Sequence, residues 1–132
     1  MAGIVDLAQL LSGMQPELGQ GEFVFCLVSG ALEEYLGLDP LAPFREDEGL
    51  TLLLHKATAE AAVLSFDGVY RQITLKVHSS LEAVGLAAAV SSQLADRGIS
   101  ANIIAACYHD HLFVPVDKAE RALTALRGLA AR

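Results

Sequence analysis

Hydrophobic and polar residues follow one another along the second half of the chain in a pattern that predicts a strand, a helix, two strands and a second helix. In the strand expected at 69–77, Ile73, Leu75 and Val77 alternate with polar residues, which indicates one buried and one solvated face. The last helix carries an apolar stripe, made of Ala119, Ala122, Leu123, Leu126, Leu129 and Ala130. This βαββα order is the core of an α+β, ferredoxin-like domain.

Short polar signals mark where three helices are expected to begin. Each signal is a capping residue followed three positions later by Glu or Gln, which allows reciprocal hydrogen bonds at the helix N-terminus. The pairs are Asp6 with Gln9, Ser79 with Glu82, and Asp117 with Glu120. The helix that begins at Ser79 is expected to end at Arg97, because Gly98 is a typical residue just past a helix C-terminus.

The remaining segments give weaker signals. They predict, in chain order, a strand at 23–28, helical turns at 31–36, an acidic loop at 45–49, a strand at 50–54 and a brief helix at 58–62. Asp67-Gly68 predicts the turn of a β-hairpin between 63–66 and the strand at 69–77. A strand at 100–108, apolar on both faces, is expected to turn at His109-Asp110 into a strand at 112–116.

The two halves of the chain form a weak internal repeat. LTLLLHKA from Leu50 parallels LFVPVDKA from Leu112, and FVFCLVSGAL from Phe23 parallels ITLKVHSSLE from Ile73. Both pairs keep their order, so the first half is interpreted as a degenerate copy of the second. We therefore predict two tandem βαββαβ subdomains with antiparallel sheets, residues 1–67 and 68–132, that exchange edge strands.

Composition narrows the class of protein. Hydrophobic residues make up 53% of the 132 residues and charged residues 19%, so apolar surface remains for pairing, and a homodimer is expected. A formal net charge of −7 without a basic cluster argues against nucleic acid and against membranes as partners. Cys26 and Cys107 lie in apolar strands and are expected to be buried, reduced thiols. With no basic leader at the N-terminus, a cytoplasmic location is expected.

The segment GISANIIAACYHDHLFVPVDKAERALTAL resembles the second half of an ACT domain, the amino-acid-sensing module of aspartate kinases and related enzymes. The blocks FREDEGLTLLL, ITLKVHSSLEAVGL and HDHLFVPV are together similar to small stand-alone bacterial proteins made of two ACT-like domains. Many ACT domains have Asp-x-Pro-Gly at the first strand-to-helix turn, whereas this chain has His78-Ser79-Ser80-Leu81. The resemblance implies a non-catalytic regulatory module that binds an amino acid or related metabolite at a subdomain or dimer interface and acts through its dimer or a partner enzyme.

The candidate ligand site is the turn between the strand at 69–77 and the helix that follows. Backbone N–H groups at a helix N-terminus suit a carboxylate, and serine hydroxyls add donors. Asn102, an amide in an otherwise apolar strand, is expected to face this turn and to accept from an ammonium group. The predicted ligand-binding residues are His78, Ser79, Ser80, Leu81, Val84, Gly85 and Asn102. The alternative is that Ser79 and Glu82 only cap the helix, in a protein–protein interaction module without a ligand.

Two further polar segments have functional interpretations. In Tyr108-His109-Asp110-His111, two His at i and i+2 point to the same side of an extended chain, but a zinc site needs three or four ligands, so no metal or cofactor is predicted. The acidic run 45–48 is expected to be solvated, the alternative being a gate that attracts an amino group. No Gly-x-Ser-x-Gly, phosphate-binding loop or His-Glu-x-x-His motif is present, so no catalytic residue is predicted, and an enzyme is left as a third alternative.

Overall fold

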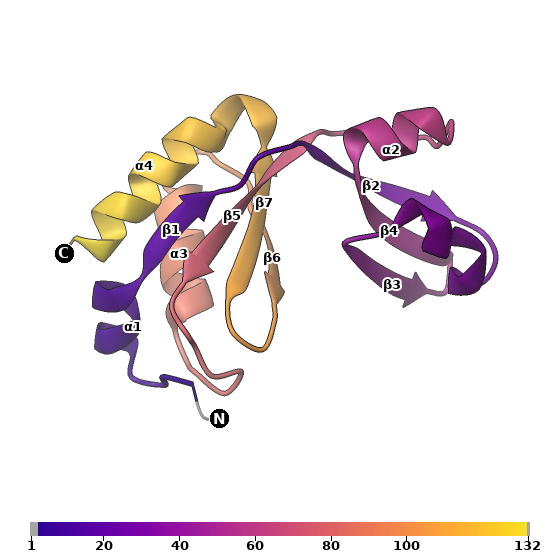
Figure 1. Ribbon diagram of the computed structural model, residues 1–132. Helices are drawn as coiled ribbons and strands as arrows, with labels where there is room; N and C mark the ends of the chain where they lie inside the picture. The colour runs from indigo at the N-terminus through magenta and orange to yellow at the C-terminus, as the bar shows by residue number, and fades with distance from the viewer. Residues whose placement is uncertain (1–2, 132) are drawn as a thin grey trace. The chain divides into compact units, whose positions relative to one another are not determined.

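The computed structural model describes residues 3–131, which fold into two compact units (Figure 1). The first unit combines the N-terminal segment up to Gln20 with the chain from Arg71 onward. The second unit is Gly21–Tyr70. Each has its own cluster of buried hydrophobic side chains. The prediction of two tandem ACT-like βαββαβ repeats with antiparallel strands is confirmed, while the boundary between subdomains at 67/68 stays a prediction.

The first unit contains a sheet with the strand order β1-β5-β7-β6 and a layer of helices. Its elements are α1 (Leu7–Gly13), β1 (Gln15–Leu18), β5 (Tyr70–Lys76), α3 (Leu86–Ala95), β6 (Asn102–Ala105), β7 (Asp110–Pro115), the 3-10 helix η2 (Val116–Lys118) and α4 (Ala119–Ala130). Helices α1, α3 and α4 contact one another, and α4 also packs on β1 and β7. The β5-α3-β6-β7-α4 succession is the predicted βαββα unit.

Strand β1 joins the sheet from the other end of the chain. It pairs antiparallel with β5, from Gln15 opposite Lys76 to Leu18 opposite Ile73. The sequence did not show this strand, because it has four residues and contains Pro16, which is tolerated only at positions such as a sheet edge. The pairing continues beyond the strand, since the amide N of Gly19 donates to the carbonyl O of Gln72 at 2.8 Å.

The core of the first unit lies between the sheet and the three helices. Its fully buried side chains include Leu10 of α1, Val90 and Leu94 of α3 and Leu126 of α4. The apolar stripe predicted for the last helix is confirmed, and so is the cap of α1, where the amide N of Gln9 donates to Asp6 Oδ1 at 3.0 Å. The last helix begins at Ala119, after a 3-10 turn, rather than directly after a cap at Asp117.

The second unit contains a sheet with the order β3-β4-β2. Its elements are β2 (Phe23–Val28), the 3-10 helix η1 (Leu32–Leu38), β3 (Ala42–Glu46), β4 (Gly49–His55) and α2 (Lys56–Ala61). Strands β2 and β4 are antiparallel from Phe23 opposite His55 to Val28 opposite Leu50, and β3 forms a hairpin with β4. Tyr70, the first residue of β5, pairs with Phe23 at the end of this sheet.

The acidic run 45–48 is exposed, as predicted, but it is not entirely a loop, because Arg45 and Glu46 pair with β4 as the end of edge strand β3. Two other expectations for this unit are wrong. Helix α2 begins at Lys56, so Thr58 is inside it. The hairpin at Asp67-Gly68 does not form, because Leu64 and Phe66 pack against the core of this unit instead of pairing with β5.

The two cysteines lie in different surroundings. Cys26 in β2 is buried, as predicted, and burial raises the pKa of its thiol. Cys107 is exposed, contrary to the prediction, because β6 ends at Ala105 and the turn that follows carries Cys107. No helix among residues 3–131 is long and apolar enough to cross a membrane.

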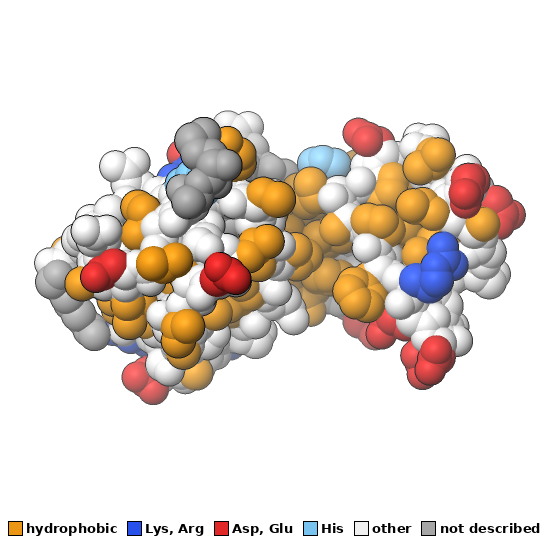
Figure 2. All heavy atoms as spheres, turned by 90° about the horizontal axis from the view of Figure 1, so that it is seen from below, with side chains coloured by type: hydrophobic (Ala, Val, Ile, Leu, Met, Phe, Trp, Pro, Cys, Tyr) orange, Lys and Arg blue, Asp and Glu red, His pale blue; other side chains and the backbone are white. Residues whose placement is uncertain are grey.

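The second unit exposes several hydrophobic side chains and carries most of the acidic residues. Phe44 and Leu27 are 72% and 57% exposed. Figure 2 shows hydrophobic side chains on one face of this unit with acidic groups around them. Nine of the 16 acidic and two of the nine basic residues of the chain lie in this unit, so it carries the whole net charge of −7 and the first unit is neutral.

Candidate functional site

The segment 77–85 connects β5 to α3 and is not helical. The prediction that a helix begins at Ser79 is wrong, because α3 begins at Leu86. Gly85 occupies the N-cap position with a φ of +102°, a left-handed conformation that interrupts any helix running through it. The predicted capping box of Ser79 and Glu82 therefore does not cap α3.

Ser79 instead pairs with the N-terminal segment of the chain. It forms an isolated parallel bridge with Ile4, in which the amide N of Ile4 donates to the carbonyl O of His78 at 2.8 Å. The amide N of Ser80 in turn donates to the carbonyl O of Ile4 at 2.9 Å. Gly3 lies so close that a Cβ on it would be 2.6 Å from the backbone N of Ser80. A tertiary contact thus holds residues 78–80 of the predicted site in an extended conformation, directly before the turn at 81–82.

The turn between β6 and β7 contacts the segment 77–85. The amide N of Ser79 donates to the carbonyl O of Tyr108 at 3.2 Å, and the rings of His78 and Tyr108 stack with centroids 4.3 Å apart. Nδ1 of His109 lies 3.2 Å from the carbonyl O of Val77, to which a protonated Nδ1 donates. The structure therefore brings His78 and Ser79 together with the β6–β7 turn.

The middle of the segment is open to solvent. The side chains of Leu81 and Val84 are 67% and 81% exposed, and that of Tyr108 is 53% exposed. Ser80 Oγ accepts from the amide N of Glu82 at 3.1 Å, so this hydroxyl stabilises the local turn. Exposed apolar side chains and turn backbone therefore lie together here.

The first turn of α3 presents backbone donors beside this segment. The first backbone bond within the helix runs from the amide N of Ala89 to the carbonyl O of Gly85 at 2.9 Å. The amides of Leu86, Ala87 and Ala88 precede that bond, and helix geometry gives them no acceptor within the helix. In the described part of the chain, no side chain caps this end of α3. Such a helix terminus favours an anionic oxygen.

Asn102 lies away from the other predicted residues. It is the first residue of β6 and pairs with Phe113, whereas the β6–β7 turn follows Ala105 opposite Asp110. At ~3.3 Å per residue, Asn102 is ~10 Å along the strand from the end that approaches His78. Its Nδ2 donates to the carbonyl O of Phe113 at 3.4 Å. The expectation that Asn102 faces the segment 77–85 is therefore not met.

The two His at 109 and 111 have separate partners. His111 Nδ1 lies 3.0 Å from Thr74 Oγ1 and 3.2 Å from Gln72 Nε2 on β5. Burial, together with the charge of His109, lowers the pKa of His111, and burial raises the pKa of Asp110. Within residues 3–131, no group of three or more His, Cys, Asp or Glu side chains is placed to hold a metal ion.

Sequence reasoning missed the contributions of Gly3, Ile4 and Tyr108. Tyr108 had a visible signal, since it is an aromatic residue directly before the polar turn, but it was grouped with metal-binding candidates. Gly3 and Ile4 carry no local signal, because their contact with Ser79 and Ser80 joins positions more than seventy residues apart.

The chain matches known protein families along most of its length. Two different models of the ACT domain match it, one over residues 2–71 and the other over residues 68–128. No curated protein sequence matches it.

Solved structures extend the comparison. A Vibrio cholerae protein of unknown function, described as a possible transport protein, is 54% identical, with 94% of this chain and 95% of that chain covered and a TM-score of 0.87. A protein from Agrobacterium tumefaciens is 17% identical, with 89% of each chain covered and a TM-score of 0.73. The ligand-free regulatory subunit of aspartate kinase from Thermus thermophilus is 12% identical, with 86% of this chain and 95% of that chain covered and a TM-score of 0.61. At such low identities, the last two matches show the fold.

Proposed function

Because this chain belongs to the ACT domain family, we propose that it is a non-catalytic regulatory module that binds an amino acid or a related small metabolite at the segment 77–85 and the first turn of α3. The structural similarity to a regulatory subunit of aspartate kinase supports a regulatory role. In this proposal the signal passes to a second copy of the chain or to a partner enzyme.

The observation that carries the proposal is the uncapped N-terminus of α3 next to exposed apolar side chains. The amides of Leu86, Ala87 and Ala88 are donors for a ligand carboxylate and need no charged side chain. Leu81 and Val84 lie in the segment directly before these amides and offer apolar surface for the rest of a small ligand. His78 and Ser79, held by Tyr108, form the side of the site that joins it to the β6–β7 turn.

The same exposed side chains support a second candidate function. Leu81, Val84 and Tyr108 are all more than half exposed, and apolar side chains that gather on a surface are typical of protein–protein contacts. In this alternative the chain is an interaction module that binds no small-molecule ligand, and the segment 77–85 contacts a partner protein.

Calorimetric titration of the full chain with each of the protein amino acids tests the proposal. We expect one amino acid, or a chemically related group of them, to bind saturably. The same ligand should raise the free energy of unfolding, by ~2.7 kcal/mol at one hundred times its Kd. If no amino acid binds or stabilises the chain, the interaction module is the better description.

A further inference from the structure

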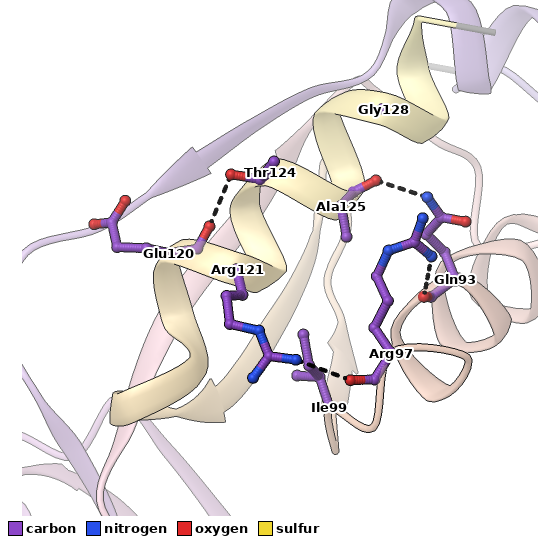
Figure 3. Close-up of a pocket in the computed structure, with 8 residues that line it drawn as sticks. All are labelled: Gln93, Arg97, Ile99, Glu120, Arg121, Thr124, Ala125 and Gly128. Carbon is purple, nitrogen blue, oxygen red and sulfur yellow. Dashed lines mark hydrogen bonds between the residues drawn. The ribbon is translucent and has the colours of Figure 1, made fainter.

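A groove of about 430 Å³ lies between the C-terminal end of α3 and the exposed side of α4 in the first unit (Figure 3). Ile99 and Ala125 are buried residues that line it, and Gln93, also buried, donates from Nε2 to the carbonyl O of Ala125 at 2.9 Å. This bond joins α3 to α4 directly under the groove. The base of the groove is therefore formed by buried residues that a hydrogen bond between α3 and α4 holds in place. None of the residues that line the groove belongs to the segment 77–85.

Two arginines border this groove. Nη1 of Arg97 donates to the carbonyl O of Gln93 at 2.9 Å, and Nη2 of Arg121 donates to the carbonyl O of Arg97 at 3.2 Å. Figure 3 shows the Arg121 side chain extending from α4 toward the backbone of Arg97, and the Arg97 side chain extending along the end of α3 toward Gln93. Each guanidinium has five N–H donors, and these bonds occupy a small part of that capacity.

Neither arginine forms a salt bridge with a carboxylate of the part of the chain that the structure describes. Among residues 3–131, no Asp or Glu oxygen lies within 4.0 Å of either guanidinium. Glu120 also lines the groove, but in Figure 3 its carboxylate points away from both arginines. Lys118 adds a third cation to this end of α3, where its Nζ donates to the carbonyl O of Gly98 at 3.0 Å.

The positive charge here exceeds what the end of α3 requires. A helix C-terminus carries a partial charge equivalent to roughly −0.5, and a single cation is enough to complement it. Three cations, Arg97, Lys118 and Arg121, bind carbonyls in or just after the last turn of α3. The residues that line the groove include two arginines and one glutamate, so the lining has a net positive charge although the chain as a whole is acidic.

We propose that this groove binds a small organic anion with more than one acidic oxygen group, such as a di- or tricarboxylate or a phosphate ester. Arg97 and Arg121 bind its oxygens with charge-assisted hydrogen bonds from the two sides of the groove. Ile99 and Ala125 contact its carbon skeleton. This second binding site is independent of the proposed amino-acid site.

Titration of the full chain with citrate and, in parallel, with inorganic phosphate tests this site, with NMR chemical shifts as the readout and ionic strength held constant with NaCl. We expect saturable shifts for Gln93, Thr124 and Gly128, which line the groove. Tighter binding of citrate indicates a carboxylate ligand, and tighter binding of phosphate indicates a phosphate ester.

Charge-removing variants identify the residues that bind. Arg121→Gln is expected to weaken binding of the preferred anion roughly tenfold or more, and Arg121→Lys to restore part of the affinity. Arg97→Gln is a second variant with the same expected loss. Arg127→Gln is the matched control, because it removes an exposed charge from α4 that does not line the groove.

Three outcomes would overturn the proposal: no saturable binding of either anion, unchanged affinity in Arg121→Gln, or shifts confined to residues outside the groove. The variant Val84→Asp tests the anion site separately from the proposed amino-acid site. Val84 lies at the other end of α3 from the groove, so this substitution should leave anion affinity unchanged. Loss of amino-acid binding in that variant, with anion binding retained, would show that the two sites are distinct.

Discussion

Gly85 has a φ of +102°, and a Cβ at this position would lie 3.0 Å from Cδ2 of Leu7. We therefore expect Gly85→Ala to lower the free energy of unfolding by ~1–3 kcal/mol, because an L-residue is strained in this conformation. Gly128 is the matched control. It lies inside α4 with nothing within 4 Å of a Cβ, so Gly128→Ala should raise stability by ~0.5–1 kcal/mol. Urea unfolding of both variants tests this difference, and equal effects would contradict it.

Val84 offers a test of the amino-acid site that leaves the fold unchanged. Its side chain is 81% exposed, so a polar residue there should cost little stability. Val84→Asp places a carboxylate directly before the free amides of α3, where it competes with and repels a ligand carboxylate. Val84→Asn has nearly the same shape without the charge. In calorimetry we expect the Val84→Asp variant to bind the amino acid roughly tenfold or more weakly than the Val84→Asn variant. Equal affinities in the two variants would place the ligand elsewhere.

His111 makes stability depend on pH. Burial, His109 and Lys76 lower its pKa, and Asp110 opposes them. The unfolded chain therefore takes up a proton at higher pH than the folded chain, and the free energy of unfolding falls as pH drops below about 6.5. His111→Gln should show a smaller loss of stability between about pH 7.5 and 5.5 than the wild type. Urea unfolding at both pH values measures this, with His55→Gln of the second unit as control. An unchanged pH dependence in His111→Gln would contradict the assignment.

At the scale of elements, α1 and β1 complete the first unit from the far end of the sequence. Leu10 and Met14 are 0% and 3% exposed in its core, and β1 forms the edge of its sheet. Loss of a single buried leucine typically costs ~2–5 kcal/mol, so loss of both elements should exceed the stability of the unit. We expect a fragment of residues 71–132 to be unfolded and to fold when a peptide of residues 1–20 is added. Amide dispersion in NMR spectra measures this, and a folded 71–132 fragment alone would disprove it.

The elements that local patterns predicted well are those with a strong periodicity of hydrophobic residues. The stripe of α4 and the alternation in β5 both specify which face is buried, and the structure buries those faces. The start of α3 was predicted wrongly from an equally strong local signal, because the bridge between Ile4 and Ser79 and the positive φ of Gly85 outweigh a capping box. The candidate site was likewise predicted only as far as local sequence determines it. His78, Ser79 and their neighbours lie together as expected, whereas Asn102 does not, since strand register placed it at the other end of β6.

For the whole molecule, exposed apolar side chains of the second unit lead us to expect a homodimer. Phe44 is 72% exposed on edge strand β3 and Leu27 is 57% exposed on β2. Figure 2 shows hydrophobic side chains on one face of this unit. Light scattering should therefore give twice the 14.0 kDa mass of the chain. Phe44→Glu should shift the mass to that of the monomer, while Val63→Glu, 89% exposed outside any strand, should not. Because each second unit carries a net charge of −7, salt should strengthen the dimer. A monomer at all salt concentrations would remove the dimer from the proposal.

The sequence by itself determined the α+β class, the two-fold repetition of strands and helices, and the membership of the ACT family, because these depend on periodic burial and on short blocks such as HDHLFVPV that act locally. Only the tertiary structure decided that β1 completes the sheet of the later segment, that the N-terminal segment pairs with Ser79, and that Arg97 and Arg121 line one groove. Each of these joins residues distant in sequence. Such contacts are chosen by the total burial and hydrogen bonding of the fold, and no local pattern encodes them.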